Sequence, residues 1–360
     1  MSKITSYNNQ FLDEMRLRTD PIADEAVADL MHNKQANQYR DIIQSLTDNN
    51  YQLPPGLPES VVHFFETTRQ LPEWADTKLL QQGQHFLEKH VTDLLLMLGL
   101  ISLPFDYAAA HGVQVLYLSE RLRNNPAKRL AETGQYVLDV GEKNGFGARG
   151  RAICSAQKVR LTHATIRYHI KQKGDWNVET RGEPINQEDM AGTNLSFSVL
   201  PIRGLRKIGV EVSQQEAQAF IHLWNVANHI MGVDESLLPD TTKEAFWLLK
   251  RISDRQHAPS QEGQAMARAL LTIVPNDNGK EIAARYTRFL LGDKTADMLD
   301  LPKTNLPDAW LAAPLLGFKQ LRQALGNQAQ QYYAIRQQFK QQLKQTEGEP
   351  FKMPSTLKPI

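Results

Sequence analysis

The stretch of sequence that decides the fold is residues 151–170, RAICSAQKVRLTHATIRYHI. On a helix, Arg160, His163 and Arg167 lie at positions i−3, i and i+4, so they share one face. Apolar residues lie on or beside the same stripe, namely Ala156, Val159 and Ile170. We therefore expect a long helix in which a histidine between two arginines borders an apolar surface.

Helical periodicity extends from this stretch in both directions, because apolar residues recur at i, i+3 and i+4 with polar faces between them. Strand signals are weak, although the run at 208–212 (IGVEV) could pair as a short strand. We therefore predict an all-α fold, a single multi-helix domain. The predicted helices cover residues 23–34, 36–48, 58–69, 78–98, 104–123, 126–141, 147–172, 186–200, 213–231, 240–256, 262–274, 278–291 and 307–345.

The domain organisation follows from breaks in this pattern. Residues 1–50 are predicted to form an N-terminal helical extension, separated from the rest by prolines at 54, 55 and 58. Residues 51–345 are predicted to form the main helical domain. Residues 346–360 contain three prolines and one glycine, so we expect an extended C-terminal tail.

Charge and composition exclude several classes of protein. The chain of 360 residues has 41 Lys and Arg against 40 Asp and Glu, whereas a nucleic-acid-binding protein normally has a basic surplus. Cys154 is the single cysteine, so a zinc or iron–sulfur site built on clustered cysteines is excluded. The first 15 residues lack an apolar signal core, and the apolar run 94–105 is too short to span a bilayer. We expect a cytoplasmic protein without integral membrane association.

The histidine stripe has two physical interpretations. Charged groups beside an apolar surface need buried partners, and a bound anionic group would supply one. Haem fits, because imidazole can bind its iron, apolar residues can contact the porphyrin, and guanidinium groups can pair with its propionates or fix nearby carboxylates. The alternative is a helix edge on which both arginines form ordinary salt bridges and His163 is merely packed.

Other candidate strings are weaker. Arg129, Glu132 and Thr133 share a helix face at i, i+3 and i+4, where an intrahelical ion pair is the simpler interpretation. The simplest interpretation of the strings 183–197 and 220–233 is that each forms an amphipathic helix packed into a core. Rival ligand candidates are His222 with His229, seven residues apart on one face, and the string that contains His85, Glu88 and His90.

Taken together, the order of these strings resembles the family of latex-clearing rubber oxygenases and the MpaB-like oxygenase of the mycophenolate pathway. The resemblance covers roughly residues 70–235 and rests on five strings in the same order. These are LPEWAD at 71–76, Arg129 to Thr133, RLTHATIR at 160–167, the string from Asn186 to Phe197, and the string from Trp224 to Gly232.

The resemblance implies an all-α fold that encloses haem b between helices, with His163 as the proximal iron ligand. It implies that Arg160 and Arg167 accompany that histidine, and that Arg129 and Thr133 lie on the distal side. Phe197 and Trp224 are expected to pack on the haem or line its pocket, as is Asn194.

One position departs from the family. Rubber oxygenases that resemble this chain carry a lysine where Glu132 stands, and the glutamate that they use as a base has no clear counterpart near residues 110–114. We therefore expect Arg129 and Glu132 to act as a distal acid/base pair, assisted by Thr133.

The expected function is that of a haem-dependent oxidoreductase, an oxygenase or a peroxygenase- or peroxidase-like enzyme. It would use O₂ or peroxide on a hydrophobic, unsaturated small molecule, and polyisoprene itself is a doubtful substrate. The alternatives are a haem-binding sensor or storage protein without turnover, and a haem-free helical interaction protein.

Overall fold

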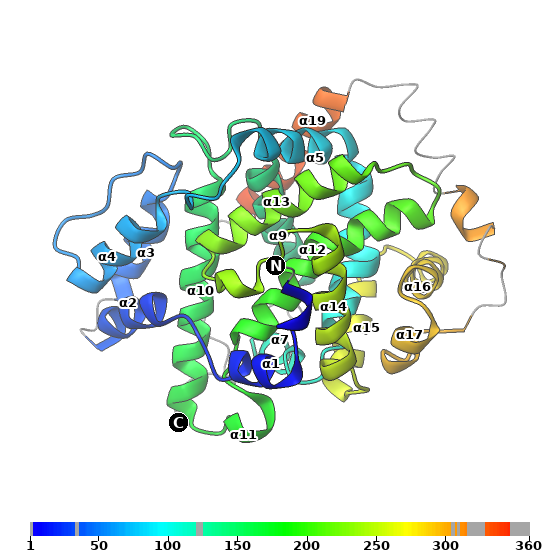
Figure 1. Cartoon of the computed structure of the whole chain (residues 1–360), viewed down its shortest axis with the longest axis horizontal. Helices are drawn as coiled ribbons and strands as arrows, with labels where there is room; N and C mark the ends of the chain where they lie inside the picture. The colour runs from blue at the N-terminus through cyan, green and yellow to red at the C-terminus, as the bar shows by residue number, and fades with distance from the viewer. Residues whose placement is uncertain are drawn as a thin grey trace.

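The computed structural model confirms an all-α fold (Figure 1). It describes residues 3–32, 36–119, 125–303, 307, 310–314 and 328–345, and no strand occurs in these ranges. The N-terminal half contains η1 (Lys3–Thr5), α1 (Asn9–Arg16), α2 (Pro21–His32), α3 (Ala36–Ser45), α4 (Glu59–Thr68), α5 (Thr77–Met97), the π-helical η2 (Leu98–Ser102), α6 (Leu103–Tyr107), α7 (Val113–Leu118), α9 (Pro126–Gly141) and α10 (Ala152–Lys173).

The rest contains α11 (Val178–Arg181), α12 (Gln187–Lys207), α13 (Gln214–Ile230), η3 (Glu235–Leu237), α14 (Thr242–Gln256), α15 (Gln261–Leu271), α16 (Asp277–Leu291), α17 (Asp293–Met298) and α19 (Gln328–Gln345). The expected tail at 346–360 lies outside the described residues. The division between an extension at 1–50 and a domain that follows stays a prediction.

The helix that carries the decisive stretch, α10, lies between two hydrophobic cores. Its residues Cys154, Leu161 and Ala164 pack into a smaller core made with α2 and α4. Residues on another face, Ile153 and Ala156, join the main core, to which α5, α9, α12 and α13 contribute. Figure 1 accordingly shows α2, α3 and α4 on one side of α10 and most of the remaining helices on the other.

The start of α10 lies five residues later than the sequence predicts, and a distant side chain explains the shift. The Asn49 side-chain amide donates hydrogen bonds to the carbonyls of Gly145 and Gly147, at 2.8 and 2.7 Å. Its Oδ1 accepts from the backbone N–H groups of Ile153 and Cys154, both at 3.1 Å. Because this buried asparagine caps the helix, residues 144–151 form turns and the helix begins at Ala152.

Three other expectations about elements need correction. The predicted helix 104–123 is interrupted at 108–112, where Ala110 N–H donates to Gln256 O and Ala258 N–H to Ala108 O. The predicted helix 186–200 continues through Pro201 to Lys207. Residues 208–212 form no strand. The predicted helix 307–345 falls partly outside the described residues, and its described part includes α19.

The apolar run 94–105 is interior, as expected: it forms the end of α5, η2 and the start of α6, and most of its side chains are buried or half-buried. Among the helices that the structure describes, none is both long and apolar enough to cross a membrane. The helices α5 and α13 approach each other closely at Gly83 of α5. A Cβ at this position would lie 2.5 Å from the carbonyl oxygen of Ala219 in α13, so glycine allows the two backbones to meet.

Candidate functional site

His163 lies on a half-covered stripe of α10. Its neighbours at i−4 and i+3, Val159 and Ile166, are half-buried as well, whereas Ala164 and Arg167 are buried. A histidine therefore borders an apolar surface inside the fold, as the sequence predicts. This stripe can contact a flat apolar ligand while an imidazole nitrogen reaches a metal within it.

The two arginines of α10 are held by carboxylates from the N-terminal segment. Arg160 Nε and Nη2 donate to Asp20 Oδ2 and Oδ1, at 2.6 and 2.8 Å, and Nη1 donates to Ile230 O at 2.9 Å. Arg167 Nε donates to Asp24 Oδ1 at 2.6 Å. Both arginines therefore pair with carboxylates of the chain itself, one of the roles that the sequence predicts for them. They fix α10 against α2 and the end of α13 and so act on His163 indirectly.

The expected distal residues lie on α9, which packs against α10. Arg129 Nη1 is 4.0 Å from Glu132 Oε2, and the Thr133 hydroxyl donates to Arg129 O at 3.0 Å. All three side chains are half-buried. A side-chain hydrogen bond of 2.5 Å joins α9 and α10 close to the segment that connects them, and Glu132 and His163 each lie about two turns beyond it. The fold thus brings the two sets of residues to a similar level on neighbouring helices.

Aromatic side chains from α9, α12 and α13 meet in one cluster. The ring centroid of Trp224 in α13 is 5.4 Å from that of Phe197 in α12 and 6.0 Å from that of Tyr136 in α9. Asn194 Oδ1 accepts from Asn228 Nδ2 at 2.8 Å. The cluster contains the sequence-predicted Phe197 and Trp224, and Tyr136 joins them.

This cluster contains buried polar atoms that no group in the described part of the chain satisfies. They are the Tyr136 hydroxyl, Asn194 Nδ2 and Trp224 Nε1. A buried donor without an acceptor costs roughly 1–3 kcal/mol, so a ligand or water that satisfies it would be favoured. Together with the His163 stripe, these atoms fit the binding of a largely apolar cofactor with polar edges.

Asp106 on α6 is a half-buried residue that was not predicted as part of the site. Burial raises its pKa well above the ordinary value, against the hydrogen bond from Ser196. The Ser196 hydroxyl donates toward both Asp106 Oδ2 and Thr193 O, each at 2.9 Å. The one sequence signal for Asp106 is that an acidic residue directly follows the apolar run 94–105.

Asp106 is followed by Tyr107, whose electrostatics link α6 to the distal residues. Burial raises the pKa of Tyr107, and the Arg129 guanidinium partly offsets this rise. The Arg129 guanidinium therefore acts electrostatically on a buried phenol of α6.

The rival ligand candidates do not form a metal site. Among the described residues, no group of three His, Cys, Asp or Glu side chains could hold a metal ion. His222 Nε2 accepts from Asp76 N–H at 3.0 Å, and His229 Nδ1 lies 3.2 Å from Glu235 Oε1. Both rings pack edge-on against Trp74, with centroids 5.8 and 5.7 Å away.

The string with His85, Glu88 and His90 lies on α5, where His85 is exposed and His90 is buried. His169 of α10 lies near Tyr168, with ring centroids 5.4 Å apart, and burial lowers its pKa. The exposed His85 thus lies on a solvated helix face, whereas His90 and His169 are at least partly covered by the fold.

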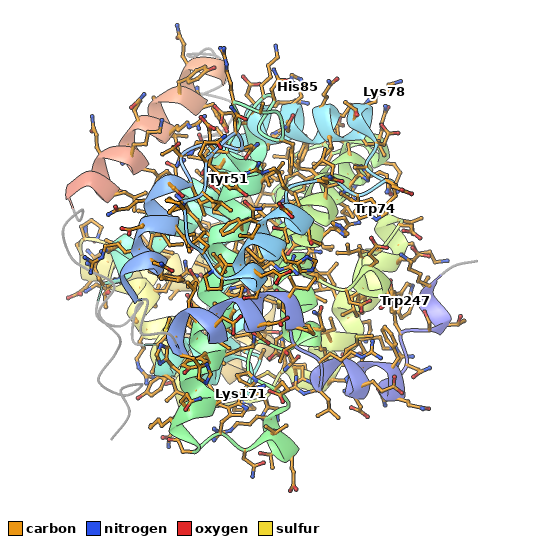
Figure 2. All side chains as sticks on the ribbon, turned by 90° about the vertical axis from the view of Figure 1, so that its left-hand side faces the viewer. Tyr51, Trp74, Lys78, His85, Lys171 and Trp247 are labelled. Atoms are coloured by element: carbon orange, nitrogen blue, oxygen red, sulfur yellow. The ribbon has the colours of Figure 1, made fainter. Side chains whose placement is uncertain are left out.

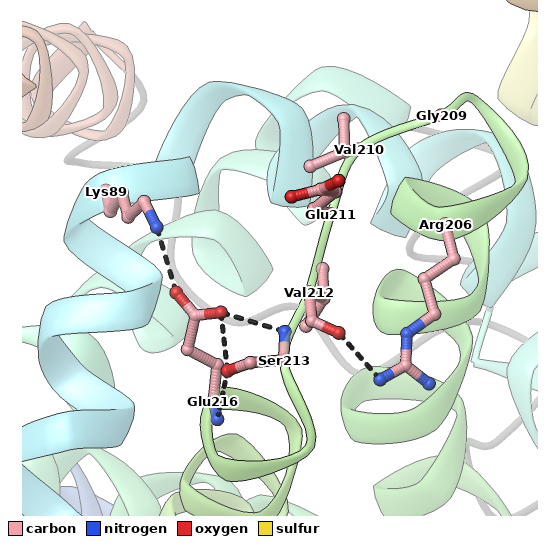
Figure 3. A pocket seen from close by; sticks show the side chains of 8 residues that line it. All are labelled: Lys89, Arg206, Gly209, Val210, Glu211, Val212, Ser213 and Glu216. Atoms are coloured by element: carbon pink, nitrogen blue, oxygen red, sulfur yellow. Dashed lines mark hydrogen bonds and ion pairs between the residues drawn. The ribbon is translucent and has the colours of Figure 1, made fainter.

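A surface hollow of about 720 Å³ lies elsewhere, between α5, α12 and the start of α13 (Figure 3). Lys89 Nζ donates to Glu216 Oε1 at 2.8 Å across it. Burial acts against ionisation of Glu216, yet hydrogen bonds from Lys89 and Ser213 lower its pKa to about 2. Lys89 and Glu216 are thus already paired with each other, and none of the sequence-predicted site residues lines the hollow.

Comparison with known proteins connects this arrangement to one family. Residues 89–326 match the family described as "ER-bound oxygenase mpaB/B'/Rubber oxygenase, catalytic domain". The chain is 29% identical over 304 residues to a rubber oxygenase of Streptomyces sp. (strain K30), which covers 82% of this chain and 74% of that protein. It is also similar to the structure of the latex clearing protein in its closed state, with a TM-score of 0.73, 27% identity, and coverage of 84% and 83% of the two chains.

Proposed function

Because the chain belongs to the mpaB/rubber oxygenase catalytic-domain family, we propose that it is a haem b-dependent oxygenase that acts on a hydrophobic small molecule. One observation carries this proposal: His163 borders a half-covered apolar stripe of α10, beside an α9 that carries Arg129, Glu132 and Thr133 at a similar level. We assign His163 as the iron ligand. The salt bridges account for Arg160 and Arg167 without a ligand, so the proposal does not depend on them.

When bound, haem would supply an iron centre able to activate O₂ or peroxide. The chain's own groups divide the remaining tasks. Glu132 accepts or gives a proton at its carboxylate, and the adjacent Arg129 guanidinium stabilises negative charge that develops on an oxygen. Thr133, whose proton is engaged by its own helix, offers oxygen lone pairs to a neighbouring donor.

The aromatic side chains of Tyr136, Phe197 and Trp224 exclude water and present an apolar surface to a substrate. A small molecule with a carbon–carbon double bond is the substrate class that this surface and the family favour. Glu132 presents a carboxylate where the resemblance to rubber oxygenases implies a lysine, so we expect chemistry distinct from polyisoprene cleavage. We expect the enzyme to be cytoplasmic.

Absorption spectroscopy of the purified protein tests the proposal. We expect a Soret band that is lost in His163→Ala and retained in His169→Ala, a control on the same helix. A wild-type protein that binds no added haem would be a haem-free interaction protein. A Soret band without turnover of unsaturated hydrophobic compounds, with either O₂ or peroxide, would indicate a haem sensor or store.

A further inference from the structure

The outer face of α14 carries an exposed aromatic pair. Phe246 and Trp247 keep 47% and 37% of their surface exposed, and their ring centroids are 6.0 Å apart. Figure 2 shows Trp247 at the right-hand rim of the molecule. The opposite face of α14 is buried through Ala245, Leu248 and Ile252, so the helix is anchored without the aromatic pair. Single exposed apolar side chains are ordinary, whereas two in contact form a continuous apolar surface.

Cationic side chains flank this pair on the same helix face. Lys243, Lys250 and Arg251 are exposed, and each lies three or four residues from the nearer ring. Asp254 is the one acidic side chain that follows on this face, and it pairs with Lys250. The face therefore has a local positive excess, although the chain as a whole has a net charge of only +1.

We propose that this α14 surface (Lys243, Phe246, Trp247, Lys250, Arg251) docks the protein onto an anionic lipid surface. Aromatic rings favour the boundary between hydrocarbon and water, and Lys or Arg beside them are attracted to anionic headgroups. The helix would lie along the surface, with its rings inserted and its cations at headgroup level. Charge complementarity selects this occupant over a second copy, because a two-fold contact between identical surfaces would oppose cation to cation.

Docking of this kind would place the protein where hydrophobic molecules collect, since such molecules partition into bilayers. The inference does not depend on haem or on turnover. It can therefore fail while the proposed oxygenase activity stands, and the reverse also holds.

Vesicle co-sedimentation of the full chain tests the proposal, with phosphatidylcholine alone and mixed with phosphatidylserine. We expect binding to the mixture that weakens with added salt. The variant Phe246→Ser/Trp247→Ser should bind at least about tenfold more weakly, because burying part of two aromatic side chains contributes that much. Arg251→Glu should also weaken binding, since each cation near the surface contributes about fivefold. Ile282→Ser, which removes an exposed residue of α16, and Lys78→Glu on α5 are the matched controls.

A dye at position 247 gives an independent measurement. Cys154 is buried and burial raises the pKa of its thiol to about 11, so an exposed cysteine in Trp247→Cys can be labelled selectively at neutral pH. We expect a blue shift of an environment-sensitive dye with anionic vesicles. Absence of the shift, equal binding by the serine double variant, or self-association that the serine variant abolishes would each overturn the proposal.

Discussion

The buried ion pair between Asp20 and Arg160 makes a sharp stability prediction. Asp20 and Arg160 expose only 3% and 7% of their surface. Arg160 makes three hydrogen bonds, two to Asp20 and one to Ile230 O. Gly232 closes over the pair, because a Cβ there would lie 2.6 Å from Asp20 Oδ2 and 2.7 Å from Arg160 Nε. Water has little access, so nothing replaces the carboxylate when it is removed.

The variant Asp20→Ala leaves a buried guanidinium with one of its three hydrogen bonds. Breaking a buried pair in this way costs about 3–5 kcal/mol of unfolding free energy. The double variant Asp20→Leu/Arg160→Met removes both charges. It should lose less unfolding free energy than Asp20→Ala, since no unpaired charge remains. Asp277→Ala breaks an exposed pair with Lys280 and should leave stability unchanged.

Urea unfolding followed by circular dichroism measures these differences at neutral pH. The coupling between positions 20 and 160 follows from a double-variant cycle. A loss below about 1 kcal/mol for Asp20→Ala would refute the reasoning, because it would mean that water or another carboxylate reaches Arg160. A double variant less stable than Asp20→Ala would refute it as well.

Gly83→Ala should lower the free energy of unfolding by about 1–3 kcal/mol, because the new methyl group meets the Ala219 carbonyl. Gly99→Ala, which has open space around it, is the control in the same unfolding assay. His257 packs against Phe105, and burial lowers its pKa from 6.5 to about 4. Since the unfolded chain binds a proton first, stability should fall by at most about 3 kcal/mol as the pH drops from 6.5 to 4, and a pH titration of the unfolding midpoint should lose this component in His257→Phe. Glu132→Gln should lower peroxide-driven turnover about 100-fold while the Soret band persists; unchanged turnover would show that the carboxylate moves no proton.

Helix positions were predictable where local periodicity and local capping agree. The helices α4, α5, α9 and α13 begin and end within one residue or two of the expected bounds, since proline, aspartate or serine signals mark their starts. The short helix α1 escaped prediction, although Asn8 caps it by accepting from Phe11 N–H. The helix has only eight residues, so its apolar pattern is too short to predict a helix by periodicity alone.

The errors arose where distant groups decide the backbone. Pro201 removes one helical hydrogen bond, a cost of about 3 kcal/mol, but the buried residues Leu200, Ile202 and Leu205 on both sides outweigh it, so α12 continues. The break at 108–112 depends on backbone pairing with residues 256 and 258, which no local pattern reveals.

The candidate site shows the same limit. The His163 stripe was visible in the sequence because helical spacing alone defines it. The partners Asp20 and Asp24 lie about 140 residues away along the chain, so their identity required the fold. Asp106 carried no spacing signal at all.

The pairing of Arg160 and Arg167 with α2 also sets where the chain can be cut. The family match begins at residue 89, yet the carboxylates that neutralise these guanidinium groups stand at positions 20 and 24. A fragment trimmed to the matched region would carry two buried cations without counterions, together with the uncovered face of α10 that Cys154 and Leu161 line. Expression fragments should therefore retain residues from the first helices, or supply them in trans as a peptide that spans Asp20 and Asp24.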